Sequence, residues 1–156
     1  MSFTSRGVRV YETIKKHLKK NDFHFDAYDD DHRIKMNVRG DDLPVSIIIR
    51  VLDERGVMQI LSPLPFNMPE EKRTDGAVAV SVANYGMING SFDYDMTDGE
   101  IRFRITQSFE DVDYNEDVFK YMLRVAFVTV DKYNDRFFMV GKGMMTLKEF
   151  IAKENN

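Results

Sequence analysis

Cysteine and tryptophan are both absent from this chain of 156 residues. Without cysteine the protein can form no disulfide, no thiolate nucleophile and no cysteine-ligated zinc site. The absence also fits a reducing compartment, so we expect a cytoplasmic location. Long hydrophobic runs are missing too. No window approaches the roughly 20 apolar residues of a membrane-spanning helix, and the segment 1–20 lacks the apolar core and cleavage site of a signal peptide. We therefore expect no membrane contact.

Positive charge is in the minority. The 22 basic residues are outnumbered by 26 acidic ones, which gives a formal net charge of -4 and a pI near 5.4. This balance disfavours bulk binding to nucleic acid, although a local basic patch remains compatible with it. Hydrophobic residues, in contrast, make up 43% of the chain. At this length folding buries about 68–70% of the surface that the unfolded chain exposes. We expect one domain, residues 1–156, with its own core.

The first segment, about residues 8–20, has the period of a helix. Apolar residues recur there every three or four positions: Val8, Tyr11, Ile14 and Leu18. Lysines crowd its last turns, where cations favour the negative end of the helix dipole. A basic amphipathic helix can lie on a membrane or on an anionic partner. The small number of apolar positions favours a helix packed on its own domain instead.

From Phe23 to Pro63 the period changes to two, which predicts an antiparallel meander of short strands. Apolar and polar residues alternate in the runs FHFDAYD, HRIKMNVRG, VSIIIRVLD and VMQILS, and turns rich in Gly, Asp and Pro separate them. The polar face of the second run predicts a surface open to solvent or to a partner. The three consecutive isoleucines at 47–49 break the alternation, which predicts a central strand covered on both faces.

The stretch 67–86 supports two interpretations. Asn67 suits the N-cap of a helix, whereas the valines between Val78 and Val82 alternate with small residues, as in a strand. The local pattern leaves both open. If a helix ends there, Gly86 is the residue that adopts the left-handed conformation after it.

The segment from Val82 to Ile105 is rich in Asn, Gly and Asp, and we asked whether it forms a catalytic or calcium-binding loop. Counted as an EF-hand loop from Asp93, the glycine comes one position late and Arg104 replaces the bidentate glutamate. Turn chemistry explains the residues better. Asn89-Gly90 leads into one strand, and the MTDG sequence closes a hairpin with a second alternating strand.

The remaining residues are predicted to be helical. Asp113 and Glu116, three positions apart, form a capping box for a long helix. Its polar positions form only a narrow stripe, so we expect burial by the sheet and by another helix or a second copy of the chain. We therefore expect a homodimer. The GKG sequence is typical of a helix-ending turn, and a second capping box, Thr146 with Glu149, starts a short final helix, about 146–154.

Together these elements predict an α+β fold in the order α-β-β-β-β-α-β-β-α plus a short C-terminal helix. The antiparallel sheet consists of a meander and a hairpin, with the helices packed mainly on one face. Three local features accompany this order: an asparagine at a helix end, a Gly-x-Phe strand start and an Asp-Gly hairpin. Their residues are Asn84, Gly90, Phe92, Asp98 and Gly99.

With these features the sequence resembles, over about residues 8–134, the YbjN family of proposed bacterial sensory-transduction regulators. The resemblance implies a secretion-chaperone-like fold and a helix at 78–84. Secretion chaperones are small acidic proteins that dimerise and bind extended segments of client proteins. YbjN-like proteins are linked to regulation and stress, and the family supplies no catalytic residue. The final helix lies outside the resemblance.

No group of residues has the spacing of a catalytic or metal-binding motif. The sequence HFDAYDDDH gathers His24, Asp26 and His32, but aspartate-rich turns between strands are ordinary and no HExxH-type spacing is present. Ser81 and Ser91 stand outside a G-x-S-x-G motif, and GKG lacks the Walker spacing. We expect no enzymatic activity, no catalytic residue, no cofactor and no metal.

The more informative feature is a set of basic residues on the predicted polar sheet face: Arg33, Lys35, Arg39, Arg50, Arg102 and Arg104. If their strands are neighbours, the set forms a patch for an acidic peptide or a nucleic acid. The alternative, which we favour, is cross-strand pairing with carboxylates such as Asp26, Asp93 and Asp95. Aromatic residues are not interleaved there, which disfavours single-stranded nucleic acid.

We therefore expect a non-enzymatic protein-interaction or regulatory module that holds a partner protein by its sheet face or a strand edge. One alternative is a small-molecule-binding protein, or a hydrolase, with a pocket around 84–92. Another is a weak nucleic-acid-binding regulator that uses the basic patch, which strongly salt-dependent retention on DNA or RNA would reveal.

Overall fold

The computed structural model describes residues 3–155 as an α+β fold on one antiparallel sheet, which confirms the predicted fold class. The six strands lie in the order β1-β2-β3-β4-β6-β5. They are β1 (Asp26–Tyr28), β2 (Arg33–Val38), β3 (Val45–Leu52), β4 (Val57–Asn67), β5 (Ser91–Tyr94) and β6 (Glu100–Ser108). The helices are α1 (Ser5–Lys20), α2 (Arg73–Tyr85), α3 (Glu116–Gly141) and α4 (Leu147–Glu154).

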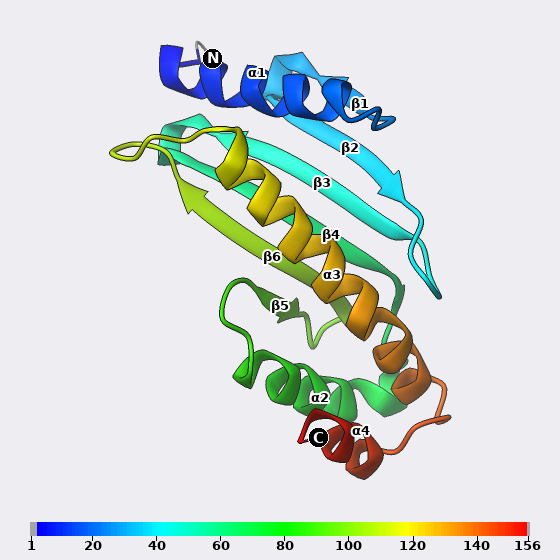
Figure 1. Ribbon diagram of the computed structural model, residues 1–156. Helices are drawn as coiled ribbons and strands as arrows, with labels where there is room; N and C mark the ends of the chain where they lie inside the picture. The colour runs from blue at the N-terminus through cyan, green and yellow to red at the C-terminus, as the bar shows by residue number, and fades with distance from the viewer. Residues whose placement is uncertain (1–2, 156) are drawn as a thin grey trace.

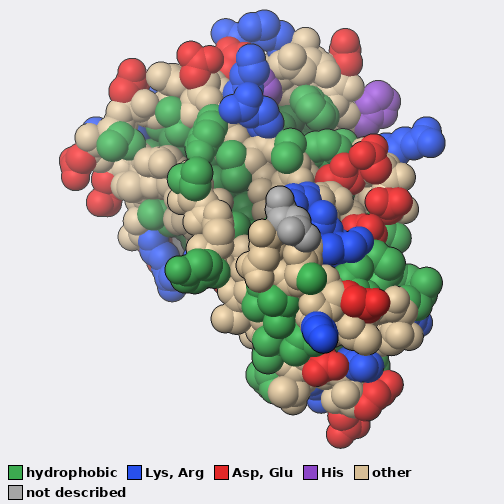
Figure 2. All heavy atoms as spheres, turned by 60° about the horizontal axis from the view of Figure 1, so that its bottom comes forward, with side chains coloured by type: hydrophobic (Ala, Val, Ile, Leu, Met, Phe, Trp, Pro, Cys, Tyr) green, Lys and Arg blue, Asp and Glu red, His purple; other side chains and the backbone are tan. Residues whose placement is uncertain are grey.

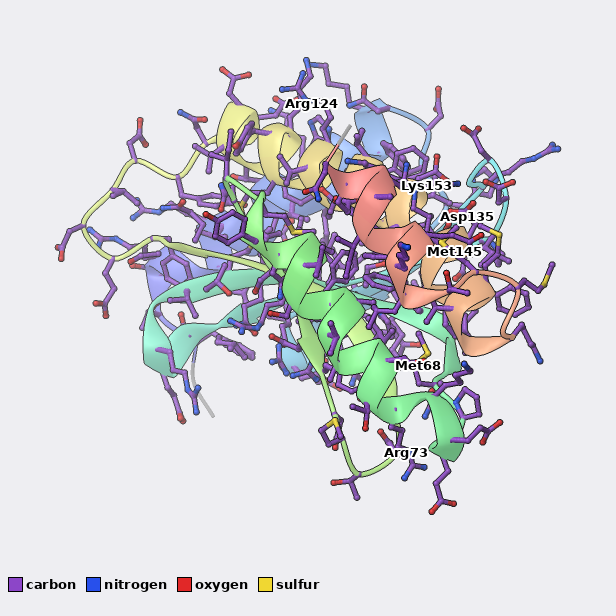
Figure 3. The ribbon with its side chains drawn as sticks, turned by 90° about the horizontal axis from the view of Figure 1, so that it is seen from below. Met68, Arg73, Arg124, Asp135, Met145 and Lys153 are labelled. Atoms are coloured by element: carbon purple, nitrogen blue, oxygen red, sulfur yellow. The ribbon has the colours of Figure 1, made fainter. Side chains whose placement is uncertain are left out.

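The helices cover one face of the sheet. In Figure 1, α1 and α3 lie across this face, while α2 and α4 lie together at the end near β5. Figure 3 shows α2 and α4 side by side, with Met68 close to the start of α2 and Met145 close to the start of α4. Within the described range, no helix combines the length and hydrophobicity needed to cross a membrane.

The core lies between the sheet and the helices because alternate strand residues point to that side. A buried row crosses four neighbouring strands at Ile34, Ile49, Ile60 and Ile105. The alternation also holds within β3, where Ile48 stays half-buried between two buried isoleucines. The predicted burial of this strand on both faces is therefore wrong, since only one face has helices over it.

The ends of two strands differ from the sequence pattern. β1 has only three residues; Phe23 and Phe25 precede it and pack against the core instead of alternating in the sheet. β4 continues through a register shift to Asn67, so the predicted N-cap role of this residue is wrong. The Asn67 side chain instead donates a hydrogen bond to the carbonyl oxygen of Asp98 at 3.2 Å.

α2 is helical, as the family resemblance implies, although its valines alternate. It begins at Arg73 after a short 3-10 turn. Its small residues allow a close approach to the sheet, because a Cβ on Gly76 would lie 2.7 Å from the Tyr94 hydroxyl. Gly86 has a φ of -93°, so the predicted left-handed conformation there is wrong. That conformation falls at Gly90, where φ is 74°.

α3 begins two residues later than predicted. Its N-cap is Asn115, whose side-chain Oδ1 accepts hydrogen bonds from the backbone N–H groups of Asp117 and Val118 at 3.0 and 3.2 Å. The predicted capping box from Asp113 is therefore wrong. Buried residues form one stripe along α3, while Tyr121 is 43% and Val128 57% exposed on its outer side. The sequence predicted that α3 is buried on more than one side. Among the described residues, its outer side is left uncovered.

The two terminal helices follow their sequence signals closely. α1 buries Tyr11, Ile14 and Leu18 as predicted, but Val8 is 40% exposed and Val10 is buried in its place. α4 begins at the predicted capping box, in which Thr146 and Glu149 exchange hydrogen bonds. Both signals are local, which is why the sequence shows them.

Candidate functional site

The sheet face turned away from the helices, which we call the open face, collects five of the six basic residues singled out above: Arg33, Lys35, Arg50, Arg102 and Arg104. In an antiparallel sheet, residues directly opposite each other lie on the same face. Arg33 lies opposite Arg50. Lys35 and Arg104 belong to a single row across the strands. Arg39 lies beyond the end of β2. On the surface drawn in Figure 2, in contrast, acidic and basic side chains are interspersed.

A row of side-chain hydrogen bonds crosses the open face. Arg50 Nε donates to Gln59 Oε1 at 2.9 Å, and Gln59 Nε2 donates to Thr106 Oγ1 at 3.0 Å. Next to this row, the Arg33 guanidinium lies 4.8 Å from the ring centre of Tyr28, within the range of a cation–π interaction. Arg50 thus has a neutral partner, and among the described residues no carboxylate forms an ion pair with it.

Asp93 on β5 pairs with two of the arginines. Its carboxylate accepts hydrogen bonds from Arg104 at 2.8 and 2.9 Å and from Arg102 at 3.1 Å. These bonds, with that of Arg104 contributing most, hold the pKa of Asp93 below its ordinary value. The cross-strand pairing that we favoured from the sequence is therefore present at Asp93. It does not describe Asp95, whose carboxylate accepts from the backbone N–H of Thr97 in the hairpin.

The remaining cations differ in their partners. Arg33 Nη2 lies 3.2 Å from Asp31 Oδ2, whereas Arg50 and Lys35 form no ion pair among the described residues. Burial lowers the pKa of Arg50 from its ordinary value, and the nearby charges of Arg102, Arg55 and Arg104 lower it further. These neighbouring cations repel the guanidinium of Arg50. Lys35 is exposed and faces Asp26 in the strand register, but the two form no ion pair among the described residues. An incoming anion would relieve this mutual repulsion.

The centre of the open face is apolar, which the sequence analysis missed. Ile48 and Leu61 lie opposite each other on β3 and β4, in the same cross-strand row as Lys35 and Arg104 and between these two cations. Leu61 is only 6% exposed although no helix covers it. The sequence did contain a signal for this apolar centre. Ile60 and Leu61 are adjacent in β4, and adjacent residues of a strand point to opposite faces, so one of the two had to point away from the core.

The connection around Asn84 is structural. Asn84 Nδ2 donates to the carbonyl oxygen of Phe92 at 3.0 Å, and Asn84 Oδ1 accepts from the Phe92 backbone N–H at 2.8 Å. The side chain thus completes the outer edge of β5 as a neighbouring strand would. Both ends of the amide are occupied, so the alternative of a ligand or hydrolase site here gains no support from this residue.

The carboxylate-rich turn after β1 has protein partners of its own. Asp29 accepts hydrogen bonds from the Tyr11 hydroxyl at 2.9 Å and from Lys15 at 3.1 Å. His32 is buried and its ring stacks on that of Tyr11 with centroids 4.4 Å apart. Within the described residues, no three acidic or histidine side chains converge as a ligand set for a metal.

The open basic face and the single helical layer define a class: this is an α+β protein of the secretion-chaperone-like fold. The particular family follows from the sequence. The chain belongs to the YbjN family, described as "Putative bacterial sensory transduction regulator", whose model matches residues 11–139. α4 lies beyond this match.

Solved structures show the same fold. YbjN from E. coli, described as "a putative transcription regulator", superposes with a TM-score of 0.61 at 11% identity, over 80% of this chain and 87% of that one. The HopA1-SchA chaperone–effector complex contains a chain with a TM-score of 0.53 at 9% identity, over 85% and 98%. A protein from Methanothermobacter thermautotrophicus gives 0.52 at 15% identity, over 86% and 98%. None of the curated proteins compared with the chain matches it.

Proposed function

We propose that this protein is a non-enzymatic interaction module that holds an acidic segment of a partner protein on its open sheet face. The observation that supports this proposal best is that five cations from three strands, β2, β3 and β6, lie on one uncovered face, in a chain whose net charge is -4. Asp93 and Asp31 neutralise part of this charge, while Lys35 and Arg50 form no ion pair among the described residues. An acidic segment complements the rest, and charge complementarity favours both its encounter rate and its specificity.

The apolar centre of the face supports a protein partner over a nucleic acid. Ile48 and Leu61 offer a place for an apolar side chain between the cations. The ring of Tyr28 lies at the edge of this face, and Arg33 and Lys35 already lie over it, at 4.8 and 5.7 Å from the ring centre. Binding of single strands relies on several free aromatic rings for base stacking.

We place the module in bacterial signalling or stress regulation, in keeping with the description of its family. The absence of cysteine supports a cytoplasmic setting. The likeness in fold to a chain of a chaperone–effector complex is compatible with the capture of a protein segment, but a fold does not by itself imply a function.

A pull-down from a lysate of the source organism tests the proposal. The face variant carries Lys35→Ser and Arg50→Ser, and a matched control carries Lys148→Ser and Lys153→Ser on α4. Both remove two positive charges. We expect an acidic protein, identified by mass spectrometry, to be retained by the wild type and the control and lost by the face variant. Equal recovery by the three proteins overturns the proposal, and recovery of nucleic acid instead, seen as a raised 260/280 nm absorbance ratio, favours the regulator alternative.

We also propose that the protein forms a homodimer through the outer side of α3. Tyr121, Val125 and Val128 follow at helical spacing along this side, and two of the three are exposed. A twofold axis would place the stripe against its own copy. This arrangement would bury the apolar positions that the single chain leaves open.

A further inference from the structure

A cleft lies between the C-terminal part of α1 and the N-terminal part of α3, with β2 and β3 beneath it. Its volume is about 350 Å³, within the range of roughly 300–1,000 Å³ typical of small-molecule sites. Six apolar side chains line it: Phe23, Met36, Val38, Ile47, Leu123 and Phe127. It is separate from the open face, which lies on the other side of the sheet.

The short first strand creates this cleft. β1 pairs only with residues 33–35 of β2, so no strand continues the sheet beside Met36 and Val38. Met36, Ile47 and Leu123 are buried and form the floor. Phe23 and Phe127 are half-buried and form the walls. An apolar hollow therefore remains at the edge of the sheet, above β2 and between α1 and α3.

Two of the four polar residues at the cleft are already engaged. His17 Nδ1 lies 2.9 Å from Glu116 Oε1, which joins the two helices at one end of the cleft. Asn21 Nδ2 donates to the carbonyl oxygen of His17 at 2.8 Å. His17 and Asn21 thus already have hydrogen-bond partners within the protein.

The other two polar residues are free cations. Lys120 and Arg124 lie one turn apart on α3, both are exposed, and neither forms an ion pair among the described residues. Arg124, labelled in Figure 3, belongs to the N-terminal part of α3, which Figure 1 shows at the end of this helix away from α2 and α4. Like charges at this spacing repel each other, and an anion placed between them would relieve the repulsion.

We propose that the cleft binds a small amphiphile with an apolar chain and an anionic head group, of the class of the fatty carboxylates. The chain lies over Met36, Ile47 and Leu123, and the carboxylate meets Lys120 and Arg124. An alkyl chain brings no polar atoms into the hollow. A peptide backbone would bring N–H and C=O groups for which the lining offers almost no partners, and burying them unpaired is unfavourable.

The test uses the full chain with ¹³C-labelled methionine and isoleucine methyl groups, titrated with decanoate below its micelle concentration. We expect saturable shifts at Met36 and Ile47, and none at Met96 or Met144, which are exposed elsewhere. Decanol, which has the same chain length without the charge, should move the same two methyl groups at higher concentration.

Charge variants locate the head group. Lys120→Glu with Arg124→Glu should weaken decanoate binding at least tenfold and leave decanol binding unchanged. The matched control, Arg6→Glu with Arg9→Glu, reverses two exposed cations of α1 and should bind decanoate as the wild type does. Equal weakening by both pairs would show a general charge effect and overturn the proposed head-group site.

A cleft-filling variant tests the chain site independently. Val38→Trp adds bulk at the cleft without altering a charge, and it should abolish the binding of both decanoate and decanol while circular dichroism shows an intact fold. Unchanged decanoate binding by this folded variant would contradict the proposal. The proposal would also be contradicted if the Met36 and Ile47 methyl signals of the wild type shifted with an acidic peptide but not with decanoate. The cleft would then be a binding site for a protein partner.

Discussion

Asn84 stands in for a missing strand at the edge of the sheet, since its side chain pairs with both backbone groups of Phe92. We expect Asn84→Ala to lower the free energy of unfolding by about 2 kcal/mol, because two hydrogen bonds are lost and a backbone N–H and C=O are left unpaired. Urea denaturation measures this. Ser81→Ala, at an exposed position of the same helix, should change it by less than about 0.5 kcal/mol. Equal effects of the two changes would show that Asn84 has no special role.

Asp93 gives the residue-scale prediction for pH. Its pKa is lowered in the folded protein, so its contribution to stability is present above the unfolded value of about 3.9 and is lost as the pH falls through the folded value. We expect Asp93→Asn to destabilise the protein by about 1 kcal/mol at pH 7, a modest effect because the pairs are partly exposed. The difference from the wild type should shrink below about pH 4 in urea denaturation. A difference that stays constant down to pH 2 would contradict the role of the charge.

At the scale of elements, the start of α3 differs between the sequence signal, which predicts an N-cap at Asp113, and the structure, in which Asn115 is the N-cap. Both Asp113 and Asn115 are residues of the N-cap type, and only the latter accepts the hydrogen bonds of the first turn. Asn115→Ala should cost about 1 kcal/mol of stability, whereas Asp113→Ala should leave thermal and urea unfolding almost unchanged. The reverse order would restore the capping box predicted from the sequence.

α2 shows why a local pattern can leave an element undecided. The alternation of valines with small residues is compatible with a strand, and the helix at 73–85 instead fits the close approach of Gly76 to the sheet. That contact joins Gly76 to Tyr94, far away in sequence. The family resemblance supplied the helix where the local pattern could not, and periodicity was sufficient for α1, β2 and β6.

At the scale of the whole molecule, the proposed homodimer gives a concentration-dependent prediction. We expect analytical ultracentrifugation to show a dimer for the wild type and a shift toward monomer for Val128→Asp. The added carboxylate would be buried in the proposed interface between the outer sides of the two α3 helices, where no partner for its charge is expected. Met144→Asp, at another exposed apolar position outside α3, should leave the dimer intact. A wild-type protein that is monomeric at all concentrations would show that the dimer prediction is wrong.

The sequence by itself determined the period of β2 and β6, the hairpin at Asp98-Gly99 and the capping box of α4, because all of these depend on neighbours a few residues apart. It also indicated which basic residues share the polar sides of their strands. Only the tertiary structure decided that these sides form one uncovered face, that β1 stops short and leaves a cleft, and that Asn84 completes the sheet edge. Each of these depends on strand pairing or helix placement between distant segments, and the order of strands in a sheet is not encoded in the period of any one of them.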